Sequence, residues 1–203
     1  RFALVGAGAT GFQIAPTIAD QVEQLNVFQR TAQWMFPNPN YHEPVPDGMK
    51  RALRHLPYFG RWFRFLILWP GAGVDLSGPR IDPDWDDSDG LAVSHRNKST
   101  RDFFLGFMAE QIGDDPNLLA KITPDYPATG KRTLQDNGSW LGCLKKDNVD
   151  LIRTGIERVE AGGIRTTDGV LHEADVICYA TGFRHNDFLW PMEITGRNGQ
   201  TLR

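Results

Sequence analysis

The start of the chain alternates short apolar runs with a helical run, which predicts a β-α-β unit. Phe2–Val5 is a continuous apolar run of strand length, and Asn26–Gln29, with Val27 and Phe28 at its centre, is the predicted second strand. Between them lie a glycine-rich turn, Gly6–Gly11, and a helix over Phe12–Ala19 that Pro16 should disturb locally. Strands joined through a helix lie parallel in one sheet, so the pattern indicates an α/β domain.

In the middle of the chain, over residues 34–126, the apolar positions change to helical spacing. Prolines open this segment, and two helix faces follow at i, i+3, i+4 and i+7: Met49, Ala52, Leu53 and Leu56, then Phe59, Trp62, Phe63, Leu66 and Ile67. A loop rich in Asp, Pro and Gly spans 71–90. Ser99 or Thr100 can cap a third helix, and Asp115-Pro116 starts a fourth with proline at the first helical position. We therefore expect a helical insertion.

An aromatic stripe runs along the second of these helices: Phe59, Trp62, Phe63 and Trp69. The simplest interpretation is that the stripe forms the core of the insertion. A helix on a membrane surface, with Arg61 and Arg64 flanking the stripe, is an alternative. The longest apolar run, from Trp62 to Trp69, is far shorter than the ~20 residues needed to span a bilayer, so we expect no stable membrane insertion.

Strand patterns return toward the C-terminus. A helix over Trp140–Lys146, with Ser139 as its cap, precedes a strand at Val149–Arg153. Three short segments then predict an antiparallel meander with Asp168-Gly169 as a hairpin turn: 156–160, 163–167 and 170–172. Asp175–Ala180 follows as a buried strand. The expected fold class is α/β: a Rossmann-like domain with a parallel sheet, a small antiparallel β-meander and a helical insertion.

The composition narrows the class of protein. The 203 residues carry 22 Lys and Arg against 25 Asp and Glu, a formal net charge of −3, which argues against nucleic acid as the main partner. Two cysteines, Cys143 and Cys178, are too few for a disulfide framework, and we expect both to be reduced in a cytoplasmic protein. The chain opens inside a strand pattern without a signal peptide, and we expect it to be a piece of a longer protein.

Gly6, Gly8 and Gly11 form a G-x-G-x-x-G pattern directly between a predicted strand and a predicted helix. In dinucleotide-binding proteins such glycines allow a tight turn, the close approach of a pyrophosphate, and close packing of helix on strand. The helix N-terminus then directs its free N–H groups at the phosphates. A glycine-rich turn that binds nothing is the alternative, but the strand and helix on either side favour a dinucleotide site.

The end of the second strand distinguishes between dinucleotides. NAD and FAD sites usually place Asp or Glu there to bind ribose hydroxyls, whereas this chain has Gln29-Arg30-Thr31. The Arg30 guanidinium can form a planar fork on a 2′-phosphate, which a carboxylate would repel. We therefore predict NADPH as the cofactor; a solvated arginine at a strand end is the alternative interpretation.

Two adjacent cations, Lys131 and Arg132, lie in a predicted loop within Asp125–Arg132 that contains both proline and glycine. Because adjacent cations repel, a loop that holds them together suggests an anionic ligand, and an ordinary surface pair is the other interpretation. The five histidines show no metal-ligand spacing, and the chain has no nucleophile elbow and no paired-cysteine motif. We therefore predict no metal site.

Several stretches match one family, in the family's order, along nearly the whole chain: Val5–Phe12, Phe28–Thr31, Asp125–Pro127, Gly130–Arg132, Asp136–Gly138, Asp147–Val149 and Ala180–Phe183. The chain resembles the middle portion of the flavin-dependent Baeyer–Villiger monooxygenases, with the greatest likeness to the 4-hydroxyacetophenone monooxygenases. In this family one glycine motif binds FAD and a second binds NADPH. The resemblance implies that this chain carries the NADPH motif, and that FAD is bound mainly by parts absent from it.

The resemblance also implies roles for particular residues. Arg30 and Lys131 would contact the 2′-phosphate of NADPH, and Arg132 matches the catalytic arginine that stabilises the oxygenated flavin. Thr181-Gly182 resembles the segment that leads back to the FAD domain. The implied NADPH site comprises Gly6, Gly8, Ala9, Thr10, Gly11, Gln13, Arg30, Thr31, Lys131, Thr181 and Gly182.

The implied reaction uses NADPH, FAD and O₂ to insert oxygen into a ketone, giving an ester or lactone. The expected division is an NADPH-binding domain at 1–33 and 127–183, a helical insertion at 34–126, and the start of the return to a missing FAD domain at 184–203. The fragment alone would be inactive. Two alternatives stay open: a fragment of a flavin monooxygenase that oxidises nitrogen or sulfur, and a stand-alone NADPH-binding module.

Overall fold

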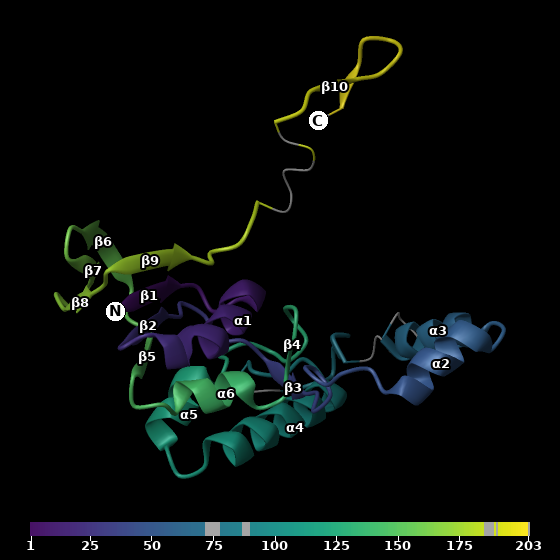
Figure 1. The fold of residues 1–203 in the computed structure, drawn as a ribbon, viewed down its shortest axis with the longest axis horizontal. Coiled ribbons are helices and arrows are strands. Elements are labelled where there is room, and N and C mark those ends of the chain that lie inside the picture. The colour runs from purple at the N-terminus through teal and green to yellow at the C-terminus, as the bar shows by residue number, and fades with distance from the viewer. Residues whose placement is uncertain (72–77, 87–89, 185–188, 190, 203) are drawn as a thin grey trace.

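A four-stranded parallel sheet forms the centre of the fold. The computed structural model describes residues 1–71, 78–86, 90–184, 189 and 191–202. The sheet has the order β5-β2-β1-β9, and every neighbouring pair is parallel (Figure 1). Its strands are β1 (Phe2–Val5), β2 (Leu25–Phe28), β5 (Val149–Ile152) and β9 (Val176–Tyr179). The predicted β-α-β unit and parallel sheet are confirmed.

The strand registers bring all four carboxyl ends to one edge of the sheet. Val5, the last residue of β1, pairs with Phe28 of β2 and with Tyr179 of β9. Phe28 pairs in turn with Ile152 of β5. The chain crosses from β1 to β2 on one side, whereas β9 lies on the other side of β1. Open α/β sheets bind ligands at the carboxyl edge beside such a change of direction.

Helices cover one face of this sheet. They are α1 (Ala9–Ile18), continued by a 3₁₀ turn (Ala19–Gln21), α4 (His95–Ile112), α5 (Pro116–Ile122) and α6 (Ser139–Leu144). Leu4 and Leu25 of the sheet share one buried core with Met108 of α4. Phe12 of α1 stacks on Trp140 of α6 with ring centroids 5.3 Å apart. The α4 and α5 helices therefore pack on the sheet itself.

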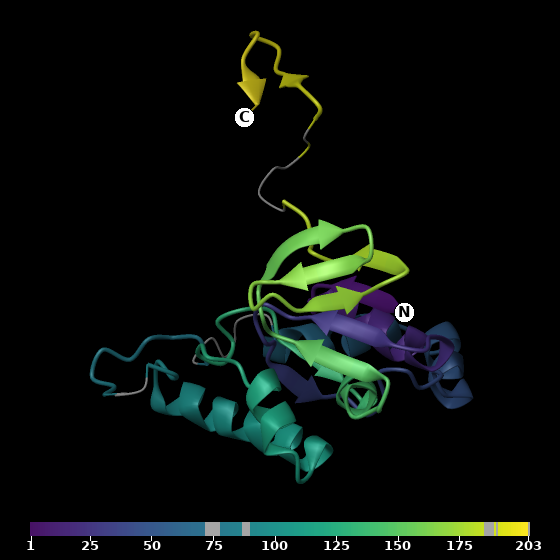
Figure 2. The same ribbon diagram turned by 90° about the vertical axis from the view of Figure 1, so that its left-hand side faces the viewer.

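The predicted meander covers the opposite face. It consists of β6 (Ile156–Glu160), β7 (Gly163–Thr166) and β8 (Leu171–Glu173), and its neighbours are antiparallel (Figure 2). Ala3, Phe28 and Ile152 of the parallel sheet pack with Ile164 of β7 in a second, smaller core. Because side chains alternate along a strand, Ala3 faces the meander while Leu4 faces the helices.

The α4 helix begins earlier than the sequence predicts. Its cap is Ser94, whose hydroxyl oxygen accepts a hydrogen bond from the backbone N–H of Asn97 at 3.1 Å. The predicted caps, Ser99 and Thr100, lie inside the helix, and their hydroxyls donate to backbone carbonyls one turn earlier. Interior Ser and Thr side chains commonly make this bond, so their presence alone does not locate the helix start. The predicted start of α5 is correct, since Asp115 caps it before Pro116.

A second short parallel pair, absent from the sequence prediction, provides the cap of α6. β3 (Met35–Pro37) pairs with β4 (Leu134–Asp136). Asp136 Oδ1 at the end of β4 accepts hydrogen bonds from the backbone N–H of Trp140 at 3.2 Å and from Ser139 Oγ at 3.4 Å. The predicted cap, Ser139, is therefore wrong: the N-cap residue is Gly138, and the side-chain acceptor for the first turn is the carboxylate of Asp136 on the preceding strand.

The predicted buried strand at Asp175–Ala180 forms β9, but it is an edge strand. Among the described strands it pairs with β1 alone, and its Val176 and Tyr179 side chains are 51% and 63% exposed. An apolar run looks alike in a central strand and at an edge, so burial at this position depends on what pairs with the second side of the strand.

Two predicted segments are described in part. In the predicted loop at 71–90, residues 72–77 and 87–89 lie outside the described residues, as do 185–188, 190 and 203 in the C-terminal segment. The described part of that segment contains an unpredicted antiparallel hairpin, β10 (Ile194–Thr195) and β11 (Thr201–Leu202). This hairpin stands away from the parallel sheet (Figure 1).

Two predicted helices of the insertion are present as α2 (Asp47–His55) and α3 (Phe59–Gly71). The prediction that the aromatic stripe forms the core of the insertion is wrong. Trp62 and Trp69 are 63% and 53% exposed, and Figure 1 shows both helices away from the sheet. Two short helices bury only the strip between them, so the other sides of an apolar helix stay exposed. Within the part of the chain that the structure describes, no helix combines the length and the apolar character needed to cross a membrane.

Candidate functional site

A cleft of about 710 Å³ opens at the carboxyl edge of the parallel sheet. The segments that follow all four strands line it, together with Arg132: Val5–Thr10, Phe28–Thr31 with Gln33, Arg153–Ile156, and Ala180–Phe183. This is the position at which open α/β sheets hold their ligands. The fold therefore brings four segments that are far apart in the sequence to one candidate binding site.

The glycine turn shapes one side of the cleft. Gly6 has a φ of +109°, which side-chain-bearing residues rarely adopt, and an added Cβ would lie 2.4 Å from the carbonyl oxygen of Ala180. Gly8 is the N-cap of α1, and as a glycine it has no side chain to accept a hydrogen bond from the first turn of that helix. Such a helix start presents N–H groups and a partial positive charge, which favour an anion.

The cleft is cationic. Three arginines line it, Arg30, Arg132 and Arg153, and no Asp or Glu occurs among its described lining residues. Arg30 and Arg153 follow the neighbouring strands β2 and β5. Several positive charges around one cleft attract a polyanionic ligand. The described lining also contains no His, Cys, Lys or Tyr, so none of these lining residues has a side chain that ordinarily titrates near neutral pH.

Most residues predicted for the site line this cleft: Gly6, Gly8, Ala9, Thr10, Arg30, Thr31, Arg132, Thr181 and Gly182. Three do not line it. Gly11 packs against Gly6, where an added Cβ would lie 1.9 Å from the Gly6 carbonyl oxygen. Gln13 Nε2 donates to Tyr41 Oη at 2.9 Å, and Lys131 Nζ lies 4.4 Å from the centroid of the Tyr126 ring.

Arg153 is the lining residue of most chemical interest that sequence analysis missed. Its Nη1 donates to the carbonyl oxygen of Lys121 at 3.3 Å, and the buried Gln29 side chain donates to the same oxygen at 3.1 Å. The backbone N–H of Gln29 also donates to the Ile152 carbonyl at 2.8 Å, which joins the two strand ends. The available signal was its place at the end of a predicted parallel strand, but only the strand order identifies β2 as the neighbour.

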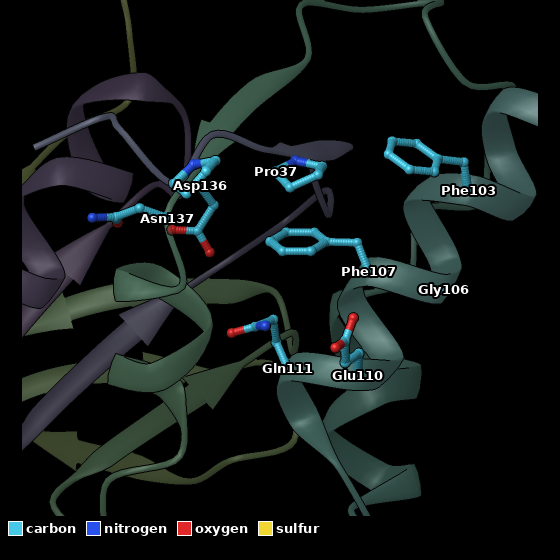
Figure 3. Close-up of a pocket in the computed structure, with 9 residues that line it drawn as sticks. Pro37, Phe103, Gly106, Phe107, Glu110, Gln111, Asp136 and Asn137 are labelled. Carbon is cyan, nitrogen blue, oxygen red and sulfur yellow. The ribbon is translucent and has the colours of Figure 1, made fainter. Parts of the chain in front are cut away.

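A second cavity, of about 550 Å³, lies between α4 and the β3-β4 pair (Figure 3). Pro37, Phe103 and Phe107 supply apolar walls, and Glu110 and Asp136 supply carboxylates. No Lys or Arg is among its described lining residues, so these carboxylates would repel a phosphate. Asp136 is 1% exposed, and its Oδ2 has no hydrogen-bond partner. The cationic cleft, and not this cavity, suits a dinucleotide.

One buried and one partly buried group outside the cleft, Cys143 and Tyr126, have shifted pKa values. Burial raises the pKa of the Cys143 thiol from about 9.0 to about 11, and the positive charge of Lys146 opposes this only partly. Burial also raises the pKa of Tyr126, whose hydroxyl donates to the Ala32 carbonyl at 3.0 Å. Among the described residues, no cluster of three or more His, Cys, Asp or Glu side chains could hold a metal ion.

The fold and the cleft together define a Rossmann-like α/β protein with a cationic cleft at the carboxyl edge of its sheet. No family model matches the sequence. Over 203 residues the chain is 37% identical to an uncharacterized monooxygenase, y4iD, of Sinorhizobium fredii, and over 211 aligned residues it is 33% identical to a Baeyer–Villiger monooxygenase of Streptomyces coelicolor. Each match covers 100% of this chain. Its relatives are thus monooxygenases, Baeyer–Villiger monooxygenases among them.

A solved structure agrees with the relatives in sequence. The crystal structure of OTEMO in complex with FAD and NADP resembles this chain with a TM-score of 0.73 and 27% identity, over 100% of this chain. The chain spans only part of each protein that it matches: 30% of y4iD, 36% of the Streptomyces enzyme and 41% of OTEMO.

Proposed function

We propose that this chain is the NADPH-binding portion of a flavin-dependent Baeyer–Villiger monooxygenase. Residues 1–33 and 127–183 form the NADPH-binding domain, 34–126 form its helical insertion, and 184–203 lead to an FAD-binding part outside this chain. The observation that carries the proposal is the cleft at the carboxyl edge of the sheet, with a glycine turn and three arginines around it. The OTEMO complex with FAD and NADP supports it.

The cleft offers a group for each charged part of NADPH. The pyrophosphate would take the N–H groups at the start of α1 beside Gly8, where an added Cβ would meet nothing within 4 Å. The 2′-phosphate would take Arg30, with Arg153 at the neighbouring strand end as a second cation. Lys131 would reach this phosphate only by leaving the Tyr126 ring. Thr31 and Thr181 would donate or accept hydrogen bonds at the sugars.

Arg132 is the proposed catalytic residue. It lines the same cleft as the glycine turn, so its guanidinium shares the space into which the cofactor would bind. A guanidinium held in place stabilises developing negative charge with little reorganisation. NADPH supplies a hydride, and FAD supplies the reaction with O₂ in the whole enzyme; the residues of this chain bind, orient and provide charge.

In the whole enzyme, a ketone, O₂, NADPH and a proton would become an ester or lactone, NADP⁺ and water. The resemblance to 4-hydroxyacetophenone monooxygenases makes aryl ketones the first substrates to test. This chain alone would bind no FAD and oxidise no ketone. Its two free cysteines favour a reducing compartment, and we assign it to the cytoplasm.

Titration calorimetry of this chain with NADPH and NADH tests the proposal. We expect NADPH to bind at least about tenfold more tightly, because charge-assisted hydrogen bonds contribute about 1.5–3 kcal/mol. Arg30→Ala should remove most of this preference and leave NADH binding nearly unchanged. Equal affinities for the two nucleotides in the parent chain would overturn the assignment. In a longer protein that carries this chain, oxidation of amines and sulfides but of no ketone would favour the alternative class of flavin monooxygenase.

A further inference from the structure

The α2 and α3 helices form a hairpin with an unusually large exposed apolar surface. We define the α2-α3 hairpin as residues 47–69. Its large exposed hydrophobic side chains are between 37% and 68% exposed: Leu53, Leu56, Tyr58, Trp62, Phe63, Phe65, Leu66, Ile67, Leu68 and Trp69. Figure 1 shows the hairpin to one side of the sheet and its covering helices. None of its residues belongs to either buried core.

The hairpin is nevertheless ordered by its own contacts. An added Cβ on Gly60 would lie 3.5 Å from Leu53 Cδ2, so the two helices pack closely where they meet. Along α3, the rings of Phe65 and Trp69 stack with centroids 5.0 Å apart. The Arg61 guanidinium lies 5.7 Å from the centroid of the Tyr58 ring in the turn. The apolar surface is therefore presented by a formed structure.

The hairpin is also strongly cationic. It contains five Lys and Arg residues against one Asp, in a chain whose formal net charge is −3. The single Asp, Asp47, pairs with Lys50 at 3.0 Å. Among the described residues, no carboxylate pairs with the other four: Arg51, Arg54, Arg61 and Arg64. Arginines without a carboxylate partner among the described residues therefore occur among Trp, Phe and Leu side chains on one projecting element.

We propose that the α2-α3 hairpin binds the surface of an anionic lipid bilayer. Helices that lie on membrane surfaces have this composition. Their Trp, Phe and Leu side chains enter the boundary between headgroups and acyl chains, and their Arg and Lys side chains bind anionic headgroups. The α3 helix has 13 residues, so the hairpin lies on the bilayer and does not cross it. A second copy fits less well, because apposed hairpins would bring their arginines together. This proposal does not rest on the proposed cofactor.

Vesicle flotation tests the proposal on the 203-residue chain. We expect binding to equimolar phosphatidylcholine and phosphatidylglycerol, little binding to phosphatidylcholine alone, and loss of binding at high salt. Arg61→Glu/Arg64→Glu should weaken binding at least about tenfold, since each basic residue near such a surface contributes about 1 kcal/mol. Trp62→Ser/Leu66→Ser should weaken it comparably through lost apolar burial. The matched control, Lys121→Glu/Arg197→Glu, makes the same charge change elsewhere and should change binding less than about threefold.

Circular dichroism melting confirms that each variant folds, and Trp emission reports the contact directly. Trp62 and Trp69 are exposed, so their emission should shift to the blue on anionic vesicles. The proposal fails if the parent chain does not float, or if the control pair weakens binding as much as the hairpin pair. It also fails if the hairpin variants abolish a concentration-dependent dimer and not flotation. If a longer protein carrying this chain does not bind the vesicles, the hairpin is covered by another part of that protein. This result would also overturn the proposal.

Discussion

A side chain on Gly11 would occupy the space of the Gly6 carbonyl, because its Cβ would lie 1.9 Å from that oxygen. The start of α1 therefore packs directly on the turn that leaves β1. Gly8 differs, since its added Cβ would meet no atom within 4 Å. Two glycines of the motif are required by the fold, and the third leaves room at the surface of the cleft.

This difference predicts opposite consequences for two similar substitutions. Gly11→Ala should lower the free energy of unfolding by about 1–3 kcal/mol, because backbone has to move to admit the methyl group. Gly8→Ala should leave stability nearly unchanged and weaken NADPH binding by about 1–3 kcal/mol, as the methyl group enters ligand space. Urea denaturation and calorimetry measure the two effects. Equal NADPH affinity for Gly8→Ala and the parent would show that no phosphate approaches this turn.

Arg153 should contribute to NADPH binding although no sequence motif marks it. Arg153→Ala should raise the Kd for NADPH about tenfold and affect NADH less, because a charge-assisted hydrogen bond contributes about 1.5–3 kcal/mol. Arg158→Ala is the matched control: Arg158 lies on β6 and pairs with Glu157 and Glu160 at 2.5 and 2.8 Å. Both variants are titrated by calorimetry. Identical losses in the two variants would mean that overall charge, and not position in the cleft, controls affinity.

The cap of α6 can be located by two alanine substitutions. Asp136→Ala should lower the free energy of unfolding by about 1–2 kcal/mol, because the N–H of Trp140 loses its acceptor. Ser139→Ala should change it by no more than about 0.5 kcal/mol. Chemical denaturation distinguishes the two. If Ser139→Ala loses more free energy of unfolding than Asp136→Ala, the side chain of Ser139 caps the helix, as the sequence predicts.

Because the Cys143 thiol is buried, we expect the protein to lose stability at alkaline pH. Burial raises its pKa from about 9.0 to about 11, so the folded protein holds this proton more tightly than the unfolded chain does. Its contribution is therefore complete below pH 9 and is lost as the pH rises toward 11. Unfolding measured across this range should show a shallower decline in Cys143→Ala. The same decline in both proteins would assign the effect to other groups, such as Tyr126.

The adjacent cations should have separable roles in a longer monooxygenase that carries this chain. Arg132→Ala should keep flavin reduction by NADPH but abolish ester formation, so that consumed O₂ appears as hydrogen peroxide. Lys131→Ala should raise the KM for NADPH at nearly constant kcat, as expected for lost uniform binding. Stopped-flow reduction and product analysis check both. If weaker NADPH binding is the sole defect of Arg132→Ala, then Arg132 has no catalytic role, and both cations serve only to bind phosphate.

The sequence by itself determined the features that depend on neighbouring residues. The run at Phe2–Val5, the glycine spacing from Gly6 to Gly11, and the alternation around Asp168-Gly169 predict a strand, a turn into a helix, and a hairpin. These patterns act through local backbone geometry and side-chain periodicity, so they can be read without a partner. The parallel sheet and most residues of the cleft follow from them.

Tertiary structure decided the features that depend on distant partners. Arg153 joins the cleft because β5 pairs with β2, and Asp136 caps α6 because β4 pairs with β3. The aromatic side chains of α3 that predict a core are exposed, because among the described residues neither buried core includes any residue of this helix. Periodicity shows which side of an element is apolar, but the surface that buries that side is contributed by residues far along the chain.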